Sequence, residues 1–153
     1  MSELLQTALV SARASVRQRD EVVFYTRSLQ LSVGVPMTFD AQAPLASAME
    51  FALAAVAADV LGGFARLADR ARLVIDAAEA VINAEVASPL AYIGVVGETG
   101  QPRLSRLTML AYLDTGEARS DLQPVWDEAL RRAPFINTLR PSVDLDLDFR
   151  ITG

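Results

Sequence analysis

The chain has 153 residues, of which 52% are hydrophobic and 22% are charged, and its formal net charge is −5. This length and composition are typical of one globular domain, so we predict a single domain over residues 1–153. Nucleic-acid-binding proteins normally need a clustered basic face to neutralise phosphates, so the acidic balance argues against that class. No basic segment precedes an apolar stretch at the N-terminus, and we expect a cytoplasmic protein.

Three absent residue types limit the chemistry of this chain. It contains no cysteine, no histidine and no lysine, and all 14 of its basic residues are arginines. It therefore offers no thiolate, no imidazole and no side-chain Schiff base. Any catalysis would have to rest on carboxylates, arginines, hydroxyl groups or backbone amides. We predict neither a metal site nor a cofactor.

The first half of the chain is expected to form strands and then one long helix. Residues 1–43 contain β-branched and aromatic stretches at 22–26 and 29–35, which predict N-terminal strands. Residues 44–70 open with a proline and are rich in alanine and leucine, which predicts a central helix. Gly62-Gly63 predicts a kink or a break in it. Small alanine side chains let another helix approach closely, such as that of a second copy.

A membrane span is the alternative for the most apolar stretch, residues 44–63. Glu50 and Asp59 lie inside this stretch, and an aspartate at the centre of a bilayer costs about 2.5–3.5 kcal/mol. A buried helix of a soluble protein is the less costly arrangement, so we predict no membrane association.

The second half, residues 71–153, is expected to supply further strands. Residues 73–87 combine alanines, which favour helix, with β-branched pairs, which favour strand, and we predict mainly strand. Residues 143–151 alternate apolar and charged side chains without error and predict the final strand. Residues 106–113 predict a strand that buries Leu107, Met109, Ala111 and Leu113.

One helix is predicted between these strands. Ser120-Asp121-Leu122-Gln123 has the form of a capping box, and the helix should end near Ala133 because Pro134 follows. The order of strands, long helix, strands, helix and strand predicts an α+β fold with helices on an antiparallel sheet. The aspartates at 144, 146 and 148 are spaced about 6.6 Å apart along the strand, which is wide for one metal ion. We interpret them as a solvated face.

Three segments carry a resemblance to a known family. Residues 44–59 (PLASAMEFALAAVAAD) open a central helix with a small-polar start and a glutamate. Residues 88–98, with Gly100 and Pro102, form a link between strands. Residues 131–140 (RRAPFINTLR) are similar to a Cys-Pro-hydrophobic-x-Asn-Thr-Leu signature. Together they resemble the OsmC/Ohr (osmotically inducible, organic hydroperoxide resistance) family from about residue 40 to the end.

The resemblance implies positions for two cysteines, and neither cysteine is present. The peroxidatic cysteine of the family falls on Asp59 and the resolving cysteine on Ala133. The carboxylate that the family places ten residues before the first cysteine falls on Met49, with Glu50 next along. The candidate pocket comprises these positions and one neighbour: Asp59, Ala133, Met49, Glu50 and Phe135.

Most of these residues also have a structural interpretation. Asp59 is either a ligand-facing anion or a general base in a repurposed pocket, or else a satisfied or solvent-reaching carboxylate in a decayed site. The last interpretation is favoured. Glu50, at a helix start, is more often a partner of the helix dipole than a catalyst. Phe135 and Trp126, beside an arginine pair, either line a pocket or belong to the core. The family's activating arginine has no clear match, and Arg27 is the weakest of candidates.

The resemblance also implies a homodimer with crossed central helices and sheets shared between the chains. Because thiol peroxidases proceed through a thiolate, a sulfenic acid and a disulfide, we predict no such activity and assign no catalytic residue. The leading hypothesis is a non-catalytic homodimer that holds a small hydrophobic or anionic ligand, or none. The alternatives are an enzyme that uses carboxylate and arginine chemistry, and a subunit that binds a partner through an apolar patch.

Overall fold

The computed structural model describes residues 7–18, 21–34 and 42–153. The chain divides into two compact units, Met1–Phe51 and Ala52–Gly153, which are described separately. The predicted strand at 29–35 extends in part beyond the described residues, since Val35 lies outside them.

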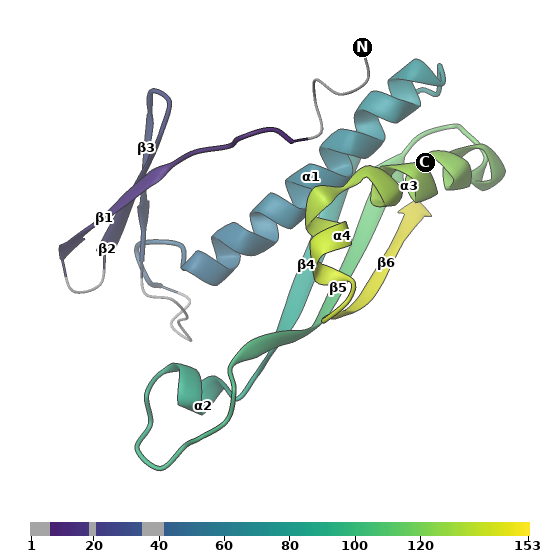
Figure 1. The fold of residues 1–153 in the computed structure, drawn as a ribbon. Helices are drawn as coiled ribbons and strands as arrows, with labels where there is room; N and C mark the ends of the chain where they lie inside the picture. Colours follow the sequence, from purple (N-terminus) through teal and green to yellow (C-terminus); the bar gives the residue numbers. More distant parts are fainter. Residues whose placement is uncertain (1–6, 19–20, 35–41) are drawn as a thin grey trace. The chain divides into compact units, whose positions relative to one another are not determined.

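The first unit contains a three-stranded antiparallel sheet (Figure 1). Its strands are β1 (Arg13–Gln18), β2 (Glu21–Thr26) and β3 (Leu29–Val33), in that order across the sheet. The strands β2 and β3 confirm the β-branched stretches predicted there, and β1 is an additional strand that pairs with β2. Arg27 lies in the turn between β2 and β3 with a left-handed φ of 50°.

Helix α1 (Ala48–Arg70) begins at a reciprocal capping box. The Ser47 hydroxyl accepts a hydrogen bond from the Glu50 N–H at 3.2 Å, and the Glu50 carboxylate accepts one from the Ser47 N–H at 2.7 Å. The helix therefore starts at Ala48 rather than at the predicted position near residue 44, because S-x-x-E satisfies its first amides there. The backbone hydrogen bond from Ser47 lowers the pKa of Glu50. Glu50 therefore helps to cap the N-terminus of α1.

The glycine pair does not break α1, which continues from Ala48 to Arg70. By length and composition alone α1 could cross a membrane. Its buried residues recur every four positions, however, and face the core of the second unit. They are Val56, Val60, Phe64 and Ala68. The helix is a core helix of an α+β fold, as predicted.

The second unit holds a sheet of three strands in the order β4-β5-β6. Strand β4 (Ala77–Ala87) pairs antiparallel with β5 (Arg103–Asp114), and the short helix α2 (Pro89–Tyr92) lies at the far end of this hairpin (Figure 1). The stretch at residues 73–87, where local signals favoured both helix and strand, is therefore a strand from Ala77 onward. The four residues predicted to be buried on β5 are all buried: Leu107, Met109, Ala111 and Leu113.

The final strand differs from the prediction in its direction. Strand β6 (Asp144–Ile151) runs parallel to β5, although a wholly antiparallel sheet was expected. Helices α3 (Arg119–Arg132) and α4 (Pro134–Leu139) form the crossover that a parallel pair requires. The alternating pattern itself is confirmed, because the aspartates of β6 are exposed while its apolar residues face inward.

The predicted capping box at residues 120–123 is wrong. Helix α3 starts earlier, with Ala118 as its N-cap and no side-chain cap, and the Ala118 carbonyl accepts bonds from the Asp121 and Leu122 amides. The Gln123 amide donates to Asp127 along the helix instead. The end of α3 is as predicted, because Ala133 is its C-cap and Pro134 opens the next helix.

Trp126 lies at the centre of the core in the second unit. Its ring contacts Phe64 of α1 at a centroid distance of 5.7 Å and Phe149 of β6 at 5.4 Å. Edge-on and tilted aromatic pairs of this kind contribute about 0.5–1.5 kcal/mol each beyond their buried area. This cluster joins α1, α3 and the sheet, and it settles the position of Trp126 as core rather than pocket.

Candidate functional site

One face of α1 and the C-terminal end of α3 enclose a small pocket of about 110 Å³ in the second unit. Its α1 residues lie four, seven, eight and eleven positions after Asp59, which places them on one side of the helix. Asp59 and Ala133, the two positions that the resemblance gives to cysteines, both line it. The complete lining is Asp59, Gly63, Arg66, Leu67, Arg70, Ala129, Arg132 and Ala133.

Asp59 has a structural partner at the start of α4. One of its carboxylate oxygens accepts a hydrogen bond of 3.2 Å from the Phe135 N–H. Helix α4 has no side-chain cap of its own, since its N-cap is Ala133, and Pro134 offers no N–H. The aspartate therefore caps α4 from a neighbouring helix and satisfies an amide that would otherwise lack an acceptor.

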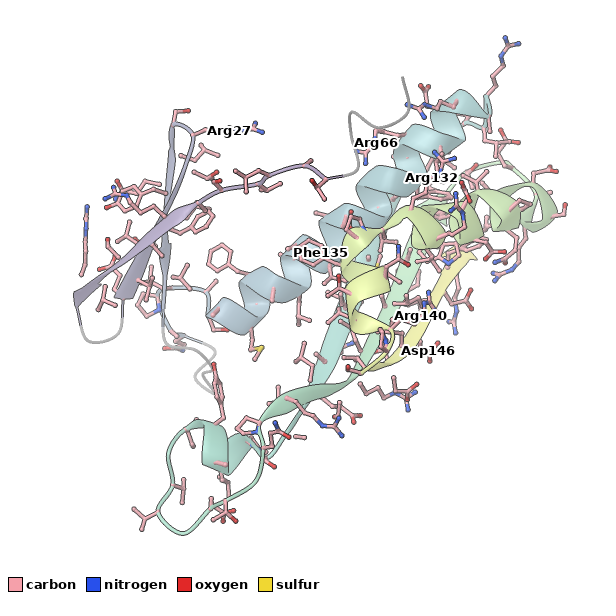
Figure 2. All side chains as sticks on the ribbon, in the orientation of Figure 1. Arg27, Arg66, Arg132, Phe135, Arg140 and Asp146 are labelled. Carbon is pink, nitrogen blue, oxygen red and sulfur yellow. The ribbon has the colours of Figure 1, made fainter. Side chains whose placement is uncertain are left out.

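Three arginines surround the pocket, and they outnumber its single acid. Arg66 and Arg70 lie one helical turn apart on α1, and Arg132 lies at the end of α3. Figure 2 labels Arg66, Arg132 and Phe135, which come from α1, α3 and α4 respectively. With Asp59 as the one carboxylate of the lining, the ionised side chains sum to a charge of +2. Such a lining attracts anions.

Arg132 is held in place by Glu128 on its own helix. Glu128 accepts hydrogen bonds from the Nε atoms of both Arg131 and Arg132, and from a terminal nitrogen of Arg131. These bonds from Arg131 and then Arg132 lower the pKa of Glu128 to about 2. By contrast, no carboxylate of the described residues lies within ion-pair distance of Arg66 or Arg70, so their charges are not neutralised locally.

Glycine 63 keeps the pocket open. A Cβ added to Gly63 would meet no atom within 4 Å, whereas a Cβ at Gly62 would lie 3.3 Å from a terminal nitrogen of Arg66. The Arg66 side chain therefore folds back along α1 over Gly62, as side chains on helices commonly do. The space next to Gly63 is left unfilled.

The remaining predicted residues do not line this pocket. Met49 and Glu50 belong to the first unit, where Glu50 is engaged with Ser47. The Phe135 side chain is half exposed and outside the lining, although its backbone donates to Asp59. Sequence reasoning missed Arg66 and Arg70, yet their spacing from Asp59 could have indicated them once the helix was predicted.

The aspartates of β6 have arginine partners. Arg106 lies 3.6 Å from Asp144 and 3.7 Å from Asp146, and Arg119 lies 2.8 Å from Asp148. Among the described residues, no group of three or more acidic side chains is arranged to hold a metal ion. The solvated-face interpretation accounts for these residues.

The cap on α4 is testable with two substitutions at Asp59. Asp59→Ala removes the acceptor of the Phe135 N–H and should lower the free energy of unfolding by about 0.5–2 kcal/mol. Asp59→Asn retains an oxygen acceptor and should lose less stability than Asp59→Ala. Urea unfolding measures both variants, and amide hydrogen exchange at Phe135 locates the effect. Equal stability of the alanine variant and the wild type would contradict the assigned cap.

The Glu128 cluster predicts a dependence of stability on pH. The folded pKa of Glu128, about 2, lies below its ordinary value of 4.5, so its contribution is complete above pH 4.5 and is lost as the pH falls toward 2. Glu128→Gln should therefore be less stable than the wild type at pH 7, and the difference should shrink between pH 4.5 and 2. Glu98→Gln, which changes the same charge in the β4–β5 connection, is the control. A stability difference between Glu128→Gln and the wild type that does not vary with pH would contradict the stabilising role of the Glu128 cluster.

The chain is similar to known proteins in structure but not in sequence. No family model and no curated protein sequence matches the chain. Solved structures do match it over nearly their full length. An OsmC-like protein from Mycoplasma pneumoniae superposes with a TM-score of 0.81 at 11% identity, over 95% of this chain and 99% of that one.

Two organic hydroperoxide resistance proteins are also similar. OhrB of Bacillus subtilis gives a TM-score of 0.68 at 17% identity, over 94% of this chain and 100% of its own. A protein from Elizabethkingia anophelis, with crystallant-derived thiocyanate bound, gives 0.74 at 16% identity, over 97% of this chain and 100% of its own. At these identities the likeness concerns the fold. The chain has the fold of the OsmC and Ohr proteins, and it has this fold without any cysteine.

Proposed function

We propose that this chain is a cytoplasmic, homodimeric binding protein that holds a small ligand in the pocket between Asp59 and Ala133 and has no thiol peroxidase activity. The observation that supports this role is the pocket itself. It is open at the two positions where the resemblance places cysteines, and an aspartate and an alanine stand there instead.

The chemistry of the pocket favours binding over peroxide reduction. A thiol peroxidase passes from a thiolate to a sulfenic acid and then to a disulfide, and the chain has no sulfur atom that can take these steps. A carboxylate has no equivalent redox cycle. Asp59 is also engaged by the Phe135 N–H, which favours a structural and ligand-positioning role over that of a general base. The alternative is an enzyme that uses carboxylate and arginine chemistry. A turnover assay would distinguish such an enzyme from a binding protein.

The homodimer is supported by the surface of α1. The most apolar 18-residue window of this helix has a mean hydropathy of 1.6, yet only 22% of it is buried within the chain. A helix that is apolar on more than one face is normally covered on each of them. Exposed alanines such as Ala54 and Ala58 offer a smooth surface on which a second α1 can pack closely.

A partner-binding subunit is a second candidate, favoured by one patch. The connection after β4 presents exposed apolar side chains, and hydrogen bonds such as that from the Val95 N–H to the Leu90 carbonyl order its backbone. The exposed residues are Leu90, Ile93, Val95 and Val96. Such a patch is typical of interaction surfaces.

Restoring both sulfurs tests the site and the missing activity together. The wild type should consume cumene hydroperoxide no faster than buffer in the presence of dithiothreitol. In the double variant Asp59→Cys, Ala133→Cys, the first thiolate takes one oxygen from the hydroperoxide and releases an alcohol. The second thiol then expels water and closes a disulfide.

Mass spectrometry should find that the double variant has lost two hydrogen atoms after one equivalent of hydroperoxide. The single variant Asp59→Cys is the control, because it should stop at the sulfenic acid. Peroxide consumption by the wild type would overturn the proposed function. Two thiols that never join would show that the positions are not adjacent.

The dimer is tested by mass in solution. Light scattering coupled to size exclusion should give about 33 kDa, twice the 16.5 kDa of the chain. Ala58→Arg places a charge on the exposed apolar surface of α1 and should shift the protein to the mass of one chain. Ala71→Arg, just beyond the end of α1, is the matched control. A wild type that runs as a single chain at micromolar concentration would count against the dimer.

A further inference from the structure

We infer that the pocket between α1 and α3 binds a small oxyanion that also carries a hydroxyl group, with Arg66, Arg70 and Arg132 holding its charge and Asp59 accepting its O–H. This assignment rests on the proposed function and names its ligand class. Hydrogen phosphate and small 2-hydroxy carboxylates share this chemistry.

The arginines supply the charge recognition. Two of them, Arg66 and Arg70, have no carboxylate within ion-pair distance among the described residues. The guanidinium group presents donors in a planar fork that matches carboxylate and phosphate oxygens, and it is always charged. Their backbone positions lie one helical turn apart, about 6 Å along the axis, and both side chains line the pocket.

Arg132 completes the arrangement from the opposite wall. Its Nε donates to Glu128, which fixes the direction of the guanidinium group. Its terminal nitrogens are absent from the hydrogen bonds of that cluster and remain as donors toward the pocket. Because Glu128 is shared with Arg131, which does not line the pocket, the cluster orients Arg132 without cancelling the positive charge of the lining.

Asp59 makes the pocket selective among anions. Only one of its oxygens accepts the Phe135 N–H, and the other has no hydrogen bond within the described part of the chain. A carboxylate accepts hydrogen bonds but donates none when ionised, so it repels an anion that has no proton to offer. An anion with a hydroxyl group can donate its O–H to the Asp59 carboxylate, so a hydrogen bond replaces this repulsion. Phosphate keeps at least one O–H near neutral pH, whereas sulfate keeps none.

The pocket is small and suits a compact ligand. Its cavity volume is about 110 Å³, and on the same measure a single water molecule needs at least about 10–15 Å³. The apolar part of the lining is small: Leu67, Ala129 and Ala133. A compact, charged molecule fits these dimensions and this lining better than an alkyl chain does.

Isothermal titration calorimetry with four probes tests the inference. Inorganic phosphate and glycolate carry a hydroxyl group, and sulfate and acetate are their matched partners without one. The wild type should bind phosphate and glycolate at least about tenfold more tightly than sulfate and acetate, because a hydrogen bond to a charged group is worth that factor or more. Binding of none of the four, or equal binding of phosphate and sulfate, would overturn the inference.

Four variants locate the site. Arg66→Gln and Arg70→Gln should each weaken phosphate binding by about tenfold or more. Asp59→Asn keeps an acceptor for the Phe135 N–H but can also donate a hydrogen bond. It should reduce the difference in affinity between phosphate and sulfate. Arg140→Gln, at the C-terminal end of α4 (Figure 2), removes the same charge outside the lining and should bind as the wild type does. Arginine variants with unchanged affinity would place the anion elsewhere and overturn the assignment.

A blocking variant separates this inference from the proposed function. Gly63→Leu fills the pocket at a position where an added Cβ meets no atom within 4 Å, so the fold should persist. If 2-propanol, a compact neutral molecule, binds the wild type but not Gly63→Leu, while none of the four anions binds, the pocket holds a ligand and only its class is wrong. If neither 2-propanol nor any anion binds, the ligand-binding function fails with it.

Discussion

The contacts of Trp126 with Phe64 and Phe149 fix the geometry on which the pocket depends. They bind α3 to α1 on one side and to β6 on the other. The residues of α1 that face this cluster alternate with those that face the end of α3, because each set recurs at helical spacing. Burial of one face of α1 therefore determines where Asp59 and Arg66 point. The position of the pocket follows from the packing of the core.

Asp59 ties the junction of α3 and α4 to α1. Ala133 is at once the C-cap of α3 and the N-cap of α4, so the chain turns between the helices without an intervening loop. Such a turn leaves the first amide of α4 in need of an acceptor. Asp59 supplies it across the pocket. The hydrogen bond ties Asp59 of α1 to Phe135 in the first turn of α4, two residues after Ala133.

Sequence patterns predicted the parts of the fold in which burial alternates. The period-two pattern of residues 106–113 and 143–151 placed β5 and β6, and the alanine-rich stretch placed α1. The direction of β6 could not be read in this way, since alternation is the same in parallel and antiparallel pairs. Helix α4 is six residues long and too short to show a helical period. The arginine group was missed because tertiary packing alone brings Arg132 of α3 to the pocket that Arg66 and Arg70 of α1 line.

The open space beside Gly63 has a cost in stability, which bears on what the pocket is for. A glycine inside a helix is about 0.5–1 kcal/mol less favourable than alanine, and α1 carries two of them in succession. An alanine at residue 63 would favour the helix, and its Cβ would meet no atom within 4 Å. Arg66 and Arg70 beside the gap have no ion-pair partner among the described residues, and a bound anion would supply one. A site that had only decayed would gain stability by closing, so the glycine and the arginines together favour an occupied pocket over an empty one.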